Sequence, residues 1–188
     1  MREGEFIDDL VTRMTAHFTK SYHIGSKINL LYGLTVDDKG NLKSGLDENK
    51  RVLRGRGSGF EQDILVYEKV EEAYTQVVPR VIAEVKMPEG FNTHEILAYA
   101  EKARRIRTVY PYARYGLLLG NKRTIPPRTI RLGQEFDFIV ALASPATQDE
   151  VDALAELLLQ EIETSKVLAT ILPGMRKAKQ LRRVLAIT

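Results

Sequence analysis

The sequence contains no cysteine among its 188 residues, which excludes disulfides, thiolate zinc sites and cysteine nucleophiles together. Any bound metal must therefore use oxygen or imidazole ligands. Long hydrophobic runs are also missing, since no stretch approaches the roughly 20 apolar residues of a membrane span. The first residues, MREGEFIDDL, are acidic where a signal peptide needs an apolar run. We therefore expect a cytoplasmic protein without a membrane segment.

Charge of one sign is only slightly in excess. The chain has 28 lysine and arginine residues against 25 aspartate and glutamate residues, a formal net charge of +3. This balance helps to attract a polyanion but lacks the strong basic field of a DNA-coating protein. Hydrophobic residues make up 44% of the chain, as in an ordinary folded protein. Because this length supplies one sizeable core, we expect a single domain over residues 1–188.

Apolar spacing predicts an alternation of helices and strands. Phe6, Leu10, Met14 and Phe18 recur every four residues, which predicts an amphipathic helix over 4–19. The further predicted elements are strands at 27–36, 62–68 and 79–86, a helix at 93–109, strands at 114–120 and 135–143, and a helix from 147 to about 164. Residues 37–59 and 121–134 are interpreted as loops, and 175–185 as a basic helix.

An acidic residue, any residue and then lysine occur in that order three times. The copies at 37–39 and 48–50 lie in the polar loop, whereas Glu84-Val85-Lys86 ends an apolar strand. Side chains alternate along a strand, so Glu84 and Lys86 share one face while Val85 points to the other. Two charges on one face of an interior strand indicate a functional site.

The strands at 62–68 and 79–86 are expected to pair as a hairpin, with Leu65 opposite Ile82 and Asp63 opposite Glu84. Directly opposed residues have β-carbons about 4.5–5.5 Å apart. Two carboxylates that close repel one another unless a proton or a cation lies between them. The pairing therefore predicts a divalent cation at this position.

Mg²⁺, or Mn²⁺ in its place, fits the expected oxygen ligands. Asp63, Glu84, a backbone carbonyl such as that of Val85, and several waters would complete the octahedral set that Mg²⁺ prefers. Lys86, on the same face, is then placed to orient or deprotonate a water attacking a phosphate, or to stabilise the developing charge.

Asp63, a gap of twenty residues and Glu84-Val85-Lys86 resemble the D-x(n)-(D/E)-x-K signature of the PD-(D/E)XK nuclease superfamily. That family's core of helix, three strands, helix and strand is similar to residues 4–120, with residues 135–188 added after it. Gln62 stands where the family motif has proline. The resemblance implies a restriction-endonuclease-like α/β fold, a three-layer α-β-α arrangement with a central mixed sheet and an αβββαβ core.

The resemblance also implies site residues and a function. Asp63 and Glu84 would bind the metal, Lys86 would be the catalytic lysine, and Glu5 is preferred over Asp8 and Asp9 as an accessory ligand from the first helix. The implied reaction is Mg²⁺-dependent hydrolysis of phosphodiester bonds, above all in double-stranded DNA, with RNA left open. Restriction or defence and repair are equally compatible roles, and a homodimer is the expected assembly.

Nucleic-acid contacts are expected from four arginines outside the motif: Arg54, Arg56, Arg104 and Arg105. Each also has a plain structural interpretation, because the first two lie in a glycine-rich loop and the last two near a helix carboxyl end, where cations are favourable without a ligand. A helix amino terminus favours Glu5 in the same way.

The alternative function is a non-catalytic nucleic-acid-binding or assembly subunit on the same fold. In that interpretation Glu84 and Lys86 belong to a solvent-facing strand and pair with Arg80 or Glu68. Each such pair would contribute a few tenths to about 1 kcal/mol. Dependence on a metal distinguishes the two functions.

Overall fold

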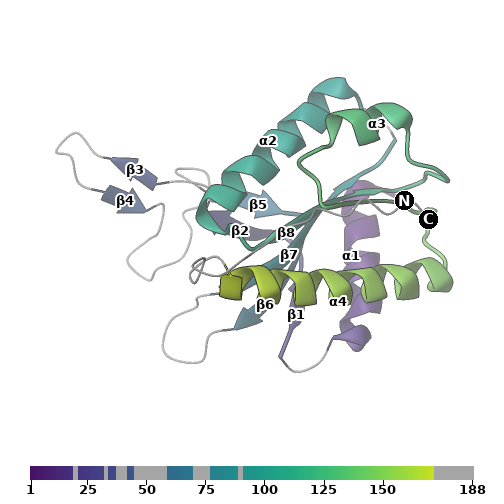
Figure 1. Ribbon diagram of the computed structural model, residues 1–188. Helices are drawn as coiled ribbons and strands as arrows, with labels where there is room; N and C mark the ends of the chain where they lie inside the picture. The colour runs from purple at the N-terminus through teal and green to yellow at the C-terminus, as the bar shows by residue number, and fades with distance from the viewer. Residues whose placement is uncertain are drawn as a thin grey trace.

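The computed structural model describes residues 1–18, 21–31, 34–36, 42–44, 59–69, 77–88 and 91–171. Its centre is a five-stranded sheet with the strand order β1-β6-β7-β8-β9 (Figure 1). The strands are β1 (His23–Gly25), β6 (Ile64–Lys69), β7 (Val77–Lys86), β8 (Arg114–Leu119) and β9 (Phe138–Ala141). β1, β6 and β7 pair antiparallel, whereas β7, β8 and β9 run parallel. The sheet is therefore mixed, as predicted.

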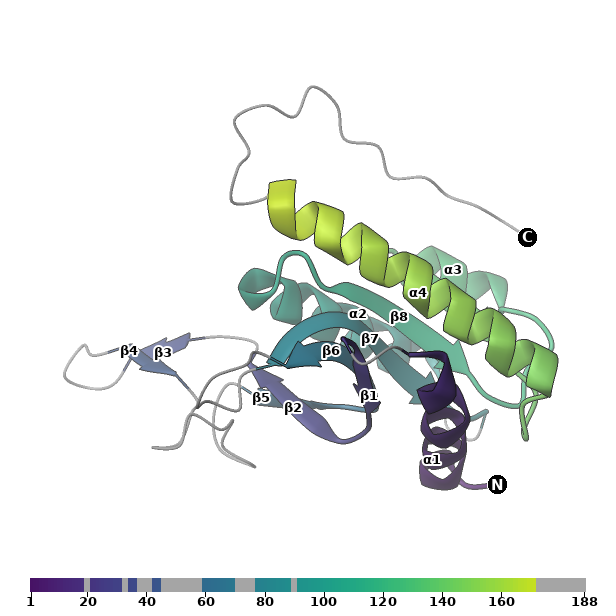
Figure 2. The same cartoon turned by 90° about the horizontal axis from the view of Figure 1, so that it is seen from below.

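Helices cover both faces of this sheet (Figures 1 and 2). α1 (Glu3–Met14), continued by the 3₁₀ turn η1 (Thr15–His17), lies on one face with α4 (Gln148–Ile171). α2 (Thr93–Val109) and α3 (Pro127–Leu132) lie on the other. The alternation of side chains along β7 divides the core accordingly: Val81, Ala83 and Val85 face α1 and α4, and Ile82 faces α2. The predicted three-layer α/β fold is confirmed.

Two short ribbons lie outside the main sheet. β2 (Ile28–Leu31) pairs with β5 (Gly59–Gln62), and β3 (Leu34–Val36) pairs with β4 (Leu42–Ser44). The prediction of one strand over 27–36 and a loop over 37–59 was therefore wrong in detail. Short ladders depend on backbone pairing with another segment, which for β2 and β5 lies far away in the sequence. Apolar periodicity within one segment gives no information about such pairing.

Local capping signals predicted the helices well. The Asn92 side chain accepts from the backbone N–H of His94 and Glu95, and Glu95 accepts from the Asn92 N–H, which completes the expected capping box of α2. Thr147 and Glu150 begin α4 in the same way, although α4 runs on to Ile171. The interpretation of residues 121–134 as a loop was wrong in part, because α3 lies within them, and β1 was not predicted. The expected helix at 175–185 lies outside the described residues.

None of the helices in the described part of the chain has the length and apolar content needed to cross a membrane.

The β6–β7 hairpin determines where the site lies. Leu65 pairs with Ile82, as predicted, and Ile64 pairs with Ala83. The register shifts by one residue near Pro79, which lacks an N–H and pairs opposite Tyr67. Because β6 begins at Ile64, the last three residues of β7, 84–86, extend beyond their antiparallel neighbour.

Candidate functional site

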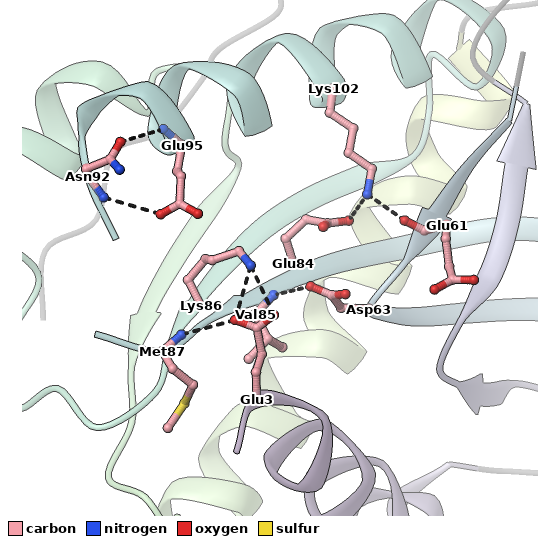
Figure 3. Close-up of polar contacts among 10 residues, drawn as sticks. All are labelled: Glu3, Glu61, Asp63, Glu84, Val85, Lys86, Met87, Asn92, Glu95 and Lys102. Atoms are coloured by element: carbon pink, nitrogen blue, oxygen red, sulfur yellow. Dashed lines mark hydrogen bonds and ion pairs between the residues drawn. The ribbon is translucent and has the colours of Figure 1, made fainter. Parts of the chain in front are cut away.

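The candidate site lies at the carboxyl end of β7, where Asp63, Glu84 and Lys86 come together (Figure 3). β8 supports this end from the other side, since Glu84 pairs with Leu117 and Lys86 with Leu119. Glu84 and Lys86 both point towards α2, which follows from the strand alternation. The predicted shared face of these two side chains is what the structure shows.

Glu84 is the most deeply buried charged group of the site, with 2% of the residue exposed. Its Oε1 accepts a hydrogen bond of 2.8 Å from Lys102 Nζ and one of 3.0 Å from the Tyr115 hydroxyl. Burial raises the pKa of Glu84 to about 7, and the neighbouring Asp63 charge adds to the increase, while Lys102 opposes it. A carboxyl group with this pKa is about half ionised near neutral pH.

Asp63 lies at the bend between β5 and β6, just before the hairpin ladder begins with Ile64 opposite Ala83. The expected direct pairing of Asp63 with Glu84 is therefore not part of the ladder. Instead, Asp63 Oδ2 accepts a 2.9 Å hydrogen bond from the Val85 backbone N–H, where the backbone of β6 has ended. Burial raises the pKa of Asp63, although the Val85 hydrogen bond and the charges of Lys102 and Lys86 oppose the increase.

Lys86 is held by an acid from α1. Its Nζ donates hydrogen bonds of 3.0 and 3.1 Å to the two carboxylate oxygens of Glu3, and it lies 5.3 Å from the centre of the Tyr99 ring. Burial by itself lowers the pKa of Lys86, but hydrogen bonding with Tyr99 and Glu3 outweighs it and leaves the pKa above its usual value. Lys86 is therefore a cation throughout the neutral range.

The acid that α1 brings to the site is Glu3, not the preferred Glu5. The Glu5 carboxylate accepts a 2.8 Å hydrogen bond from the Arg2 backbone N–H and caps its own helix. Asp9 pairs with Arg13. The helix was predicted to begin at residue 4, one residue too late to include Glu3.

Three further side chains, Tyr99, Lys102 and Tyr115, join the site without having been predicted. Tyr99 and Lys102 are three residues apart on α2, so they occupy one helix face next to the buried stripe that includes Ala100 and Ala103. In the sequence, a tyrosine and a lysine beside an apolar stripe resemble other surface residues of a helix, so no local pattern identifies them.

The alternative pairing of the β7 charges is not what the structure shows. Arg80 and Glu68 pair with each other, with Arg80 Nε 2.9 Å from Glu68 Oε1. Neither therefore neutralises Glu84 or Lys86, whose ionic partners are Lys102 and Glu3.

Of the four arginines expected to contact nucleic acid, the structure describes two. Arg104 and Arg105 lie on the exposed face of α2, each 2.7 to 2.8 Å from the Glu101 carboxylate. The single negative charge of Glu101 thus offsets one of the two positive charges and leaves a net charge of +1 in this cluster. Arg54 and Arg56 lie outside the described residues.

A metal ion at this site would have two acids as side-chain ligands. Within the described ranges, no group of three or more histidine, aspartate or glutamate residues is arranged to hold a metal ion. Asp63 and Glu84 remain as two carboxylates close enough that the charge of Asp63 contributes to the raised pKa of Glu84. Two such acids provide oxygen ligands of the kind that Mg²⁺ takes together with water.

Comparison with known proteins assigns the chain to no family. No family model and no curated protein matches the chain. Among solved structures, the chain is similar to the small subunit of the heterodimeric restriction endonuclease R.BspD6I, at 11% sequence identity over 93% of this chain and 98% of that one, with a TM-score of 0.27. Similarity at this level establishes neither fold nor function, so both rest on the geometry described above.

Proposed function

We propose that the protein is a Mg²⁺-dependent nuclease that hydrolyses phosphodiester bonds in double-stranded DNA, with Asp63, Glu84 and Lys86 at its active site. The observation that carries this proposal is the convergence of two desolvated carboxylates and a lysine at the end of one strand. This order of groups resembles the PD-(D/E)XK signature. Mn²⁺ would substitute for Mg²⁺.

The donor set fits a divalent cation. Mg²⁺ is commonly bound by one or two carboxylates, with waters and substrate phosphates as the remaining ligands. Burial disfavours the anionic forms of Asp63 and Glu84, and a cation between them would offset that cost. When bound, such an ion supplies Lewis-acid stabilisation of the phosphoryl oxygens.

The protein's own groups have distinct roles in this proposal. Asp63 and Glu84 would hold the ion, and the Val85 carbonyl is a candidate third ligand. Lys86 presents an ammonium group beside the two acids, where it stabilises the negative charge that develops on the phosphate. Glu3 positions this ammonium group through its two hydrogen bonds.

DNA would reach the site along the edge where β7 and β8 end. The loop after β8 is tied to the site by the hydrogen bond of 2.9 Å from Gly120 N–H to the Lys86 carbonyl. Lys122 and Arg123 follow in this loop and stand outside the ion pairs formed among the described residues. Arg128 directs its guanidinium to the neutral Phe91 carbonyl at 3.1 Å. Cations of this kind suit contacts with backbone phosphates.

A second function, a non-catalytic nucleic-acid-binding or assembly subunit, is favoured by one observation. Both charged residues of the β7 motif already have ionic partners, Lys102 for Glu84 and Glu3 for Lys86. Such pairs could serve the fold alone. The difference between the two functions is whether the acids bind a metal and act on phosphates.

Cleavage assays test the proposal. Wild type, Glu84→Gln and Lys86→Met are incubated with supercoiled DNA, linear DNA and RNA, each with Mg²⁺, with Mn²⁺ and with EDTA. Glu101→Gln and Lys166→Met, which remove surface charges on α2 and α4, serve as matched controls. We expect Mg²⁺-dependent cutting by wild type and both controls, and none by the two site variants, with circular dichroism showing that they remain folded.

The products also report on assembly. Linear product formed without a nicked precursor indicates two sites acting on two strands, as in a homodimer, whereas accumulation of nicked circles indicates a single site. If wild type cuts neither DNA nor RNA with either metal, the nuclease proposal fails and the subunit function replaces it.

A further inference from the structure

Lys102 is the second lysine of the site, and it comes from α2. Its Nζ donates a 2.8 Å hydrogen bond to Glu84 Oε1 and a 2.6 Å hydrogen bond to the Glu61 backbone carbonyl. The side chain is only 14% exposed, and the ammonium group lies 5.6 Å from the centre of the Phe60 ring. A positive charge thus already lies against the buried acid, held by partners from two strands (Figure 3).

We propose that Lys102 is a built-in counter-cation that competes with the divalent metal for Glu84. The inference rests on the proposed function, because it takes Glu84 as a metal ligand. Lys102 balances the charge of Glu84 in the metal-free protein, and metal binding forces its ammonium group away from the carboxylate.

Geometry supports competition rather than cooperation between the two cations. The hydrogen bonds from Lys102 and Tyr115 both end on Oε1 of Glu84, so that oxygen is occupied on two sides. A metal ion at Glu84 would therefore either take the place of the ammonium group or lie within a few ångströms of it. Two cations that close repel strongly where water is scarce, and little water reaches a carboxylate whose residue is 2% exposed.

The lysine side chain is suited to this exchange. Its flexible four-carbon stem lets the ammonium group move without displacing the helix that carries it. The contact with the Glu61 carbonyl and the Phe60 ring lies on the β5 side of the site, away from Tyr115 on β8. Lys102 is accordingly a positioning residue that sets the metal affinity of the site.

Metal binding measured directly tests the inference. Isothermal titration with Mn²⁺ at about pH 8, above the pKa of Glu84, compares wild type with Lys102→Met and Lys102→Arg. Lys166→Met removes one surface lysine and is the control for net charge. We expect Lys102→Met to lower the Kd for Mn²⁺ by at least about tenfold, equivalent to about 1.4 kcal/mol, with little change in the other two variants.

A second variant and a second readout guard against misfolding. Lys102→Gln keeps a polar side chain that can still donate to Glu84 while removing the charge, and it should show the same direction of change. Mn²⁺ should raise the thermal unfolding temperature of both neutral variants more than that of wild type, because tighter binding to the folded state stabilises it further.

The outcomes separate this inference from the nuclease proposal. Equal or weaker Mn²⁺ binding by both neutral variants, alongside metal-dependent cleavage by wild type, would overturn the competition and leave the nuclease intact. Tighter Mn²⁺ binding by the neutral variants without any cleavage by wild type would support the competition and overturn the nuclease proposal. Absence of Mn²⁺ binding in every variant overturns both.

Discussion

Glu3 accepts two hydrogen bonds from Lys86 Nζ, at 3.0 and 3.1 Å, although 83 residues separate the two in the sequence. Its Oε2 also accepts from the Met87 backbone N–H at 3.4 Å. The first turn of α1 is thereby joined to the end of β7. The helix that covers one face of the sheet thus supplies a group to a site that opens on the other.

The ion pair between Glu3 and Lys86 should affect the pKa of Lys86 strongly and the free energy of unfolding only slightly. Glu3→Gln removes the negative charge beside Lys86 and should lower the pKa of Lys86, while reducing the free energy of unfolding by less than about 1 kcal/mol, as is usual for a partly exposed ion pair. NMR titration with ¹³C-labelled lysine measures the pKa. Glu5→Gln is the control, since Glu5 caps α1 without touching Lys86, and an equal shift in that variant would contradict the assignment.

Glu84 should make the metal-free protein less stable as the pH rises. Its pKa is about 7 in the folded protein, against an ordinary value of 4.5, so the folded protein holds this proton more tightly than the unfolded chain. The contribution of Glu84 to the free energy of unfolding is therefore largest below about pH 4.5. It falls as the pH rises through 7, by on the order of 3 kcal/mol. Urea unfolding across this range measures it.

The variant Glu84→Gln provides the comparison for this pH dependence. Glutamine does not titrate, so the decrease between about pH 4.5 and 7 should become shallower, with the remaining slope due to groups such as Asp63, whose pKa is also raised. Identical slopes in wild type and variant would show that Glu84 does not titrate in this range.

The Phe138 ring leaves no room for a side chain at Gly116 on β8. A β-carbon placed there would lie 2.0 to 2.4 Å from three ring atoms of Phe138 on β9. Gly116→Ala should therefore cost about 1–3 kcal/mol of stability, as overpacking does in other cores. Chemical denaturation measures the decrease, and the same substitution made in a Phe138→Leu background should cost less. Gly4→Ala, where nothing lies within 4 Å, is the matched control and should not destabilise.

The basic loop after β8 should bind nucleic acid more strongly than the arginines of α2. Lys122→Ala with Arg123→Ala should weaken DNA binding and reduce the slope of log affinity against log salt by about 1 for each phosphate that the protein no longer neutralises. Arg104→Ala with Arg105→Ala removes the same number of charges, but these are paired with Glu101, so a smaller effect is expected. Fluorescence anisotropy over a salt series measures both, and a larger effect from the α2 pair would reverse the assignment.

Local features of the sequence were sufficient for part of the fold. The bounds of α2 follow from its capping box and from its apolar stripe of Ile96, Ala100, Ala103 and Ile106, all of which are buried. The pairing of Leu65 with Ile82 follows from the symmetry of a single hairpin. Each of these depends on residues close together in the chain, where spacing carries the information.

Long-range contacts account for what could not be predicted. Glu3 reaches Lys86 only because α1 packs across the end of β7, and Lys102 reaches Glu84 only because α2 folds back over the sheet. Side chains on a helix surface look alike in sequence whether they face water or a buried acid. α3 was missed for a similar reason, since its six residues are too few to show a helical period.

Asp63 has a structural role in the sheet and a separate role in the proposed chemistry. It completes the hydrogen bonding of β7 through the Val85 N–H, and it faces the centre where the proposed chemistry occurs. A substitution at Asp63 that cannot accept this hydrogen bond would leave the Val85 N–H without its partner and lower the stability of the fold, whether or not the protein is catalytic. Evolutionary change at this position is therefore constrained by the sheet itself, so a lineage that had abandoned cleavage could still retain the acid.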